Sequence, residues 1–97
     1  KMKILNKEGL ELDIQFPFYK LWEIGDYGIT LTKITENLLV TDIQLSIEDT
    51  IDSVVFGQYT AGSLPAFLSY TTKEEYDNQS ANKEKFEVAA QKLKEII

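Results

Sequence analysis

The sequence of 97 residues contains no cysteine, no histidine and no arginine. Without cysteine the chain can form no disulfide, no thiolate nucleophile and no cysteine-based metal site. Without histidine it lacks the usual general base near neutral pH, and without arginine it lacks a bidentate clamp for phosphate or carboxylate. Carboxylates, lysine, tyrosine, serine and threonine remain. We therefore expect a protein that is not an enzyme and that uses no cofactor and no metal ion.

Long apolar runs are also missing. No stretch approaches the roughly 18 apolar residues of a membrane span, and no basic start followed by an apolar segment indicates a signal peptide. The five glycines fit neither a phosphate-binding loop nor a dinucleotide fingerprint. The absence of cysteine is compatible with a reducing compartment. We expect a soluble, cytoplasmic protein that does not act at a membrane.

The residues that are present describe one ordinary globular domain. Hydrophobic residues make up 43% and charged residues 27% of the chain, and five Phe, five Tyr and one Trp argue against disorder. A chain of this length buries somewhat over ~60% of its unfolded surface and can fold alone. Residues 1–97 are therefore predicted to form a single small domain.

The charge is negative and unevenly distributed. The net charge is −6, but residues 8–52 carry ten carboxylates and two lysines, which gives that segment −8. An acidic body repels phosphate backbones, so nucleic-acid binding is not expected, whereas a basic protein would be attracted. Solubility alone also explains such a charge.

Residues 10–16 give the clearest pattern. Leu10, Leu12, Ile14 and Phe16 alternate with polar residues, which places four apolar side chains on one face of a strand. A short apolar stretch over 3–6 precedes them, so the two segments predict a hairpin.

A second hairpin is predicted from residues 29–34 and 38–45. Both stretches are rich in β-branched residues, and residues 35–37 suit a tight connection. The alternation is less regular here, because Leu38 and Val40 lie opposite Leu39 and Ile43. That pattern favours a strand covered on both faces.

Three helices are predicted, with different support. Residues 47–56 have an N-cap at Ser46, an apolar stripe and a stop at Gly57, although residues 54–56 could instead begin a strand. A capping box at Thr72 indicates a helix beginning at residue 73, which residues 77–80 then interrupt. The best-supported helix ends the chain, with an apolar stripe at Phe86, Ala89, Ala90, Leu93 and Ile97.

The elements together predict an α+β fold. Its antiparallel sheet has about four to five strands, formed by two hairpins and covered by a middle helix and a C-terminal amphipathic helix. A small bent sheet or partial barrel closed by the last helix is the alternative. Residues 17–24 fit either a short helix or an irregular crossing, and residues 66–71 fit a strand or a helical turn.

The most suggestive candidate for function is the aromatic run over residues 16–22 with the acids that follow it. Trp and Tyr are enriched at interface hot spots, although large aromatics also fill small cores. The carboxylates of residues 11 and 13 share one strand face and could extend a binding surface, or simply be solvated. The candidate protein-binding residues are Tyr19, Trp22, Glu23, Asp26, Tyr27, Glu11 and Asp13.

These features predict a non-enzymatic domain that binds a basic protein, in the manner of an inhibitor or immunity-type protein. One alternative is an assembly module that forms a homo-oligomer through the aromatic run or the last helix. Another is a small-ligand binder that uses carboxylates and Tyr. A Ser-His-Asp hydrolase is excluded for the isolated chain, because Ser63 has no histidine to activate it.

Overall fold

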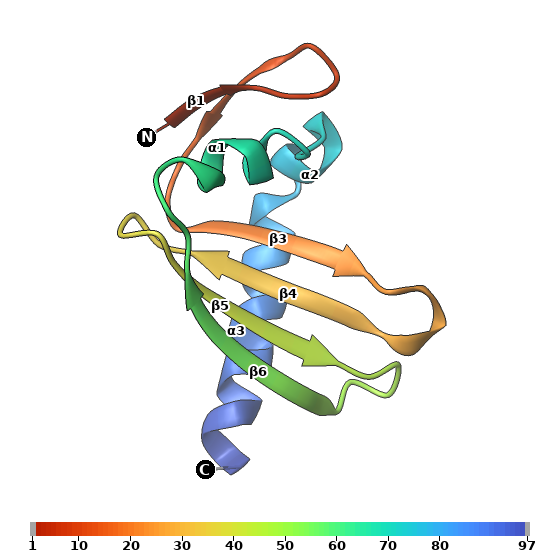
Figure 1. Ribbon diagram of the computed structural model, residues 1–97. Coiled ribbons are helices and arrows are strands. Elements are labelled where there is room, and N and C mark those ends of the chain that lie inside the picture. Colours follow the sequence, from red (N-terminus) through yellow and green to blue (C-terminus); the bar gives the residue numbers. More distant parts are fainter. Residues whose placement is uncertain (1, 97) are drawn as a thin grey trace.

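A computed structural model describes residues 2–96 and contains a four-stranded antiparallel sheet, a separate two-stranded hairpin and three α-helices (Figure 1). The α+β class and the antiparallel sheet predicted from the sequence are confirmed. The hairpin pairs β1 with β2, and the sheet has the order β3-β4-β5-β6. The strands are β1 (Met2–Leu5), β2 (Glu11–Ile14), β3 (Phe18–Glu23), β4 (Ile29–Ile34), β5 (Leu39–Leu45) and β6 (Ile51–Gln58). The helices are α1 (Ser63–Leu68), α2 (Lys73–Asp77) and α3 (Gln79–Ile96), with one 3-10 turn at Gly25–Tyr27.

Both predicted hairpins are present. In the first, Ile4 lies opposite Leu12, and the side chains of Leu12 and Ile14 are buried as the alternation indicates. Leu10 is 42% exposed, because it lies in the connection that precedes β2. The second hairpin is β4–β5, in which Leu31 lies opposite Ile43.

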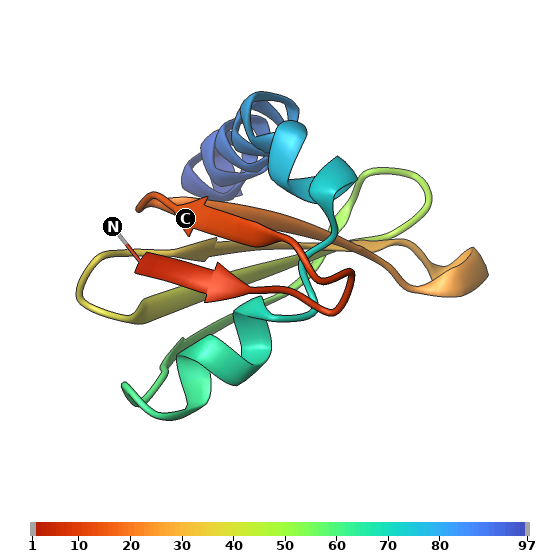
Figure 2. The ribbon, with the colours of Figure 1, turned by 90° about the horizontal axis from the view of Figure 1, so that it is seen from above.

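The four-stranded sheet is covered on both faces. On one face α3 packs through Phe86 and Ala89 against Tyr19, Leu31 and Ile43. On the other face α1 and the β1–β2 hairpin cover the side chains of Phe18, Ile34 and Val40. Seen from above, α3 and α1 lie on opposite sides of the sheet (Figure 2). Each strand therefore has apolar residues in both alternating sets, as the irregular pattern of residues 38–45 predicts.

The predicted helix over 47–56 is wrong. Residues 46–50 form a tight turn, and β6 follows it, antiparallel to β5. Ser46 still satisfies backbone N–H groups as a helix cap would, since its Oγ accepts hydrogen bonds from the backbone N–H groups of Glu48 and Thr50, each at 3.2 Å. The same capping chemistry closes a turn here, because β-branched residues at Ile51 and Val54 favour pairing with β5.

Residues 18–23 are a strand, so both interpretations of residues 17–24 are corrected. β3 pairs with β4 along its whole length, from Phe18 opposite Ile34 to Glu23 opposite Ile29. The local i, i+3, i+4 spacing suggests a helix, but pairing with a neighbouring strand overrides such a local preference.

The chain after β6 is helical. The ambiguous residues 66–71 begin inside α1, and the capping box at Thr72 is confirmed, because its Oγ1 accepts from the Glu75 backbone N–H at 3.1 Å. Asn78 separates α2 from α3, as the weak helix propensity of this region predicts. None of the helices described over residues 2–96 is long and apolar enough to cross a membrane.

Gly28 joins the β3–β4 connection to the end of β5. Its φ is 134°, and a Cβ built there would stand 1.9 Å from the backbone oxygen of Leu45. No L side chain fits this conformation or this space without moving the backbone. The two turns at this end of the sheet are therefore held together by close backbone contact.

We expect Gly28→Ala to lower the free energy of unfolding by at least about 2 kcal/mol, because it adds both a clash and a strained φ. Urea denaturation followed by far-ultraviolet circular dichroism measures the change. Gly57→Ala is the matched control, since nothing lies within 4 Å of its Cβ position. Equal stability of the two variants would contradict the close approach.

Candidate functional site

Two turns meet at the end of the sheet where β3 and β5 finish, on the right in Figure 1. One connects β3 to β4 and the other connects β5 to β6, and residues from both line a common shallow pocket. We call this surface the acidic tip. It consists of the carboxylates Glu23, Asp26, Glu48, Asp49 and Asp52 and the apolar or aromatic side chains Ile24, Tyr27 and Ile47.

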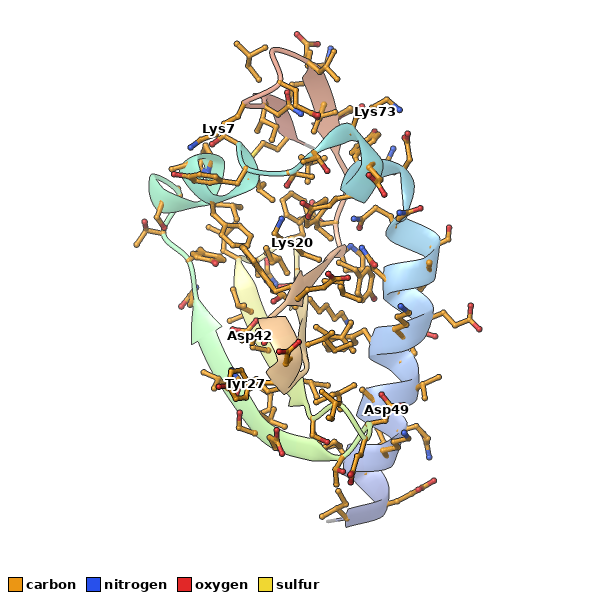
Figure 3. The ribbon with its side chains drawn as sticks, turned by 90° about the vertical axis from the view of Figure 1, so that its right-hand side faces the viewer. Lys7, Lys20, Tyr27, Asp42, Asp49 and Lys73 are labelled. Atoms are coloured by element: carbon orange, nitrogen blue, oxygen red, sulfur yellow. The ribbon has the colours of Figure 1, made fainter. Side chains whose placement is uncertain are left out.

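The acidic tip combines exposed apolar area with unpaired negative charge. Tyr27 is 83% exposed, Ile47 72% and Ile24 43%. Among the residues that the structure describes, no lysine lies within 4.0 Å of any of its five carboxylates. Viewed directly onto this end of the sheet, Asp49 lies beside α3, and Tyr27 lies on the side away from that helix (Figure 3).

Four of the candidate residues lie at or beside this tip. Glu23, Asp26 and Tyr27 belong to it, and Trp22 precedes Glu23 at the end of β3. The structure thus gathers them with Ile47 and Glu48 of the second turn. Sequence reasoning missed that second turn, because it assigned residues 47–56 to a helix.

Tyr19 lies in the core and does not belong to a surface. It is 5% exposed, and its ring contacts Phe86 edge-on with 5.7 Å between centroids. The reason is the strand alternation: Tyr19 faces α3, whereas Phe18, Lys20 and Trp22 point to the opposite face. The aromatic run is therefore divided between two cores and an exposed margin.

The remaining candidates, Glu11 and Asp13, lie on β2 and away from the tip. Glu11 is exposed and 3.9 Å from Lys3, across the hairpin. The backbone oxygen of Asp13 accepts a hydrogen bond from the Tyr76 hydroxyl at 3.0 Å, which fixes this strand near α2. The hairpin lies above the sheet in Figure 1, whereas the tip lies at the sheet's far end.

Trp22 stands at the margin of the face that α1 partly covers. Its indole N–H donates to Thr32 Oγ1 at 3.0 Å, and the Thr32 hydroxyl donates to Asp42 at 2.6 Å. The ring also packs against Phe67, with 5.4 Å between centroids, and remains 37% exposed. A tryptophan held in this way presents a rigid edge. The sequence analysis did not identify Asp42 as a candidate, although Asp42 is two residues from Val40 on β5 and so lies on the same face.

Lys20 is a buried cation that the sequence analysis did not single out. Its side chain is 3% exposed, pairs with the Glu75 carboxylate and lies 4.4 Å from the centre of the Trp22 ring. The signal was its position between Phe18 and Trp22, which places all three on one strand face. An ammonium held by a carboxylate serves here as a buried structural cation.

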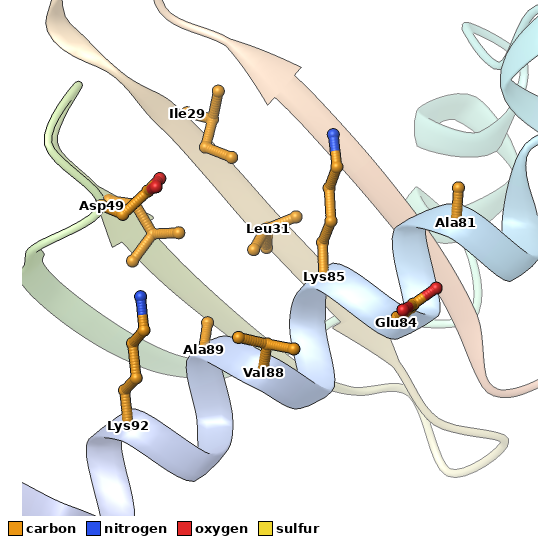
Figure 4. A pocket seen from close by; sticks show the side chains of 10 residues that line it. Ile29, Leu31, Asp49, Ala81, Glu84, Lys85, Val88, Ala89 and Lys92 are labelled. Atoms are coloured by element: carbon orange, nitrogen blue, oxygen red, sulfur yellow. The ribbon is translucent and has the colours of Figure 1, made fainter.

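A pocket of about 570 Å³ opens between α3 and the sheet (Figure 4). Core side chains such as Leu31 and Leu45 form its floor. Lys85 and Lys92 stand on the helix side, while Asp49 and Glu84 contribute negative charge. These opposite charges balance, so the lining favours neither an anion nor a cation.

The described residues contain no group of three acidic side chains placed to hold a metal ion. Comparisons with protein-family models, with curated proteins and with solved structures found no match to this chain. The surface chemistry of the chain itself is therefore the basis for a functional proposal.

Replacing Glu75 with glutamine would leave the Lys20 ammonium buried without its counter-charge. Breaking a buried ion pair costs about 3–5 kcal/mol, and water can screen part of this loss because Glu75 is 30% exposed. We expect Glu75→Gln to lower the free energy of unfolding by about 2 kcal/mol in urea denaturation.

The double variant Lys20→Met/Glu75→Gln should regain part of that loss, because it also removes the unpaired charge. Asp77→Asn is the control on the same helix. It breaks the exposed Lys73–Asp77 pair and should change stability by less than about 0.5 kcal/mol. A double variant less stable than Glu75→Gln alone would contradict the role assigned to the pair.

Burial raises the pKa of Tyr59 above its ordinary value of 10.0, and the nearby Asp42 carboxylate raises this pKa further. The unfolded chain therefore loses this proton first as the pH rises. The stability contributed by Tyr59 is complete below its unfolded pKa and is lost as the pH rises through the folded pKa. We expect Tyr59→Phe to make the alkaline loss of stability less steep.

Urea denaturation at a series of alkaline pH values measures that slope. Identical slopes for the wild type and Tyr59→Phe would contradict the contribution of Tyr59.

Proposed function

We propose that this chain is a non-enzymatic domain that binds a basic protein through the acidic tip, in the manner of an inhibitor or immunity-type protein. The observation that carries the proposal is that exposed Tyr27 and Ile47 share the acidic tip with five carboxylates, none of which has a lysine partner within residues 2–96. Apolar anchors surrounded by charge of one sign are typical of a binding surface.

The two kinds of side chain have separate tasks in this proposal. The carboxylates attract a positively charged surface over a distance and orient it, which raises the association rate at low salt. Tyr27 and Ile47 then lose their exposed area against the partner, and such buried anchors supply most of the affinity. Charge therefore governs the rate of encounter, and apolar contact governs how long the complex lasts.

The tip is also firmly supported. Gly28 lies against the Leu45 backbone oxygen, and Ser46 closes the second turn with hydrogen bonds to the backbone N–H groups of Glu48 and Thr50. The hydrogen bond from Trp22 to Thr32 fixes the end of β3. A surface ordered before binding loses less conformational entropy when the partner docks.

Capture from cell lysate by the immobilised protein tests the proposal. We expect retention of a basic protein at low salt and weaker retention at moderate salt. Asp26→Lys/Glu48→Lys should lower this retention at least about tenfold, because it reverses charge where the partner docks. Tyr27→Ala should lower it about tenfold without changing the charge.

Glu36→Lys/Glu95→Lys is the matched control. Each double substitution raises the net charge by four, from −6 to −2, but Glu36 and Glu95 lie outside the acidic tip. The control should retain the partner, and circular dichroism verifies that all variants fold. If both double variants lost retention equally, net charge alone would explain the binding, and the acidic tip would have no specific role. Capture of no basic protein at either salt concentration would overturn the proposal.

A further inference from the structure

The two edges of the four-stranded sheet differ. On the β3 edge, the Gln79 side chain occupies the place of a neighbouring strand at Tyr19. Its Oε1 accepts from the Tyr19 backbone N–H at 2.8 Å, and its Nε2 donates to the Tyr19 backbone oxygen at 2.5 Å. Asn82 also donates to this oxygen, at 3.4 Å. The β3 edge is therefore occupied at this point by side chains of α3.

The β6 edge has no such cover. Within residues 2–96, the backbone groups of β6 hydrogen-bond only to β5. Val55 and Phe56 are 53% and 73% exposed. Proline, lysine, inward-pointing charges and β-bulges commonly protect edge strands. Residues 51–58 contain no proline and no lysine, and the bulge in the pairing of β6 with β5 lies at the start of β6, where Gln44 pairs with Ser53 and Leu45 with Ile51. An open strand of eight residues can pair with another strand.

The long helix α3 also extends beyond this edge. It crosses the sheet on one face, and its C-terminal end projects past β6 (Figures 1 and 3). The apolar stripe that begins with Phe86 and Ala89 continues to Leu93 in this projecting part, and Ile96 is 69% exposed. A strand added to β6 would lie beneath this end of the helix and cover apolar area on both elements.

We propose that β6 pairs antiparallel with β6 of a second copy of this chain, around a two-fold axis at Val55. In this register Val55 faces Val55 of the second copy, and Phe56 faces Val54 of the second copy. Asp52 falls opposite Gln58, so no like charges meet. A register centred on Val54 would instead place Phe56 opposite Asp52, and one centred on Phe56 would place Val54 opposite Gln58. Of the three registers, only the one centred on Val55 gives each of Val54, Val55 and Phe56 an apolar partner.

Symmetry supports a second copy as the occupant of this edge. The two-fold axis is perpendicular to the extended sheet, so both α3 helices lie on the same face and each projects over the other copy. Phe56 faces the α3 side of the sheet, because it follows the same alternation as Val54, yet it is 73% exposed. The projecting helix of the other copy would cover it. Antiparallel pairing also places the two acidic tips at opposite ends, which limits their repulsion.

Sedimentation equilibrium from micromolar to millimolar concentrations tests the proposal. We expect the wild-type mass to rise from 11.1 kDa toward twice that value. Phe56→Lys should remain at 11.1 kDa at all concentrations, because lysine on an edge strand opposes pairing. Val88→Lys, at a side chain on α3 that is 54% exposed, is the matched control and should still dimerise.

Cysteine substitution tests the register. The chain contains no cysteine, so Val55→Cys places a single thiol on the proposed axis. Directly opposed residues of antiparallel strands lie within the distance that a disulfide spans. Mild oxidation should therefore link two copies of Val55→Cys, whereas Val88→Cys should remain a single chain.

A wild-type protein that stays monomeric over the whole range would overturn the proposal, as would a Phe56→Lys variant that dimerises like the wild type. Equal cross-linking of Val55→Cys and Val88→Cys would overturn the register. These outcomes are independent of partner binding. Asp26→Lys/Glu48→Lys should still dimerise if the acidic tip serves another protein, and Phe56→Lys should still retain the basic partner.

Discussion

The pairing of β3 with β4 is the constraint on which the rest of this structure depends. It alternates Phe18, Lys20 and Trp22 with Tyr19 and Leu21, and so sends large side chains to both faces of the sheet. Phe18 enters the core beneath α1 and the hairpin, while Tyr19 enters the core beneath α3. A shift by one residue would exchange the two sets and turn the charge of Lys20 toward α3, away from the carboxylate of Glu75.

The same register determines what remains at the surface. Trp22 is the last member of its set, so it stands at the margin of the covered face, fixed by Thr32 and Phe67. Lys20, one position inward on that face, is buried and requires the carboxylate of Glu75. An ion pair whose position follows from strand alternation therefore ties β3 to α2. The acidic tip begins where β3 ends.

The sequence predicts those parts of the fold in which local preference and tertiary environment agree. Residues 10–16 alternate cleanly because β2 has one buried face, and the stripe from Phe86 onward is regular because α3 packs on one side only. Residues 47–56 misled the prediction, because Ser46 caps a turn as well as it would cap a helix. Residues 18–23 lacked a clear strand signal, since a strand buried on both faces loses its alternation. Composition was enough to propose Trp22, Glu23, Asp26 and Tyr27 as candidates. Their position close to the second turn, which contains Ile47 and Glu48, could not be predicted, because it depends on long-range strand pairing.

The amide of Gln79 has a consequence for the way this protein could assemble. Through Gln79, the first turn of α3 occupies the backbone groups of Tyr19 on the β3 edge, whereas within residues 2–96 no side chain occupies the outer backbone groups of β6 in this way. In the proposed dimer, pairing through the β6 edge alone closes the assembly at two copies. Local unwinding of that turn would expose the backbone groups of Tyr19 on the β3 edge. A chain with two unpaired sheet edges can add further copies without limit. On that proposal, the hydrogen bonds of one side-chain amide oppose the addition of further copies at the β3 edge.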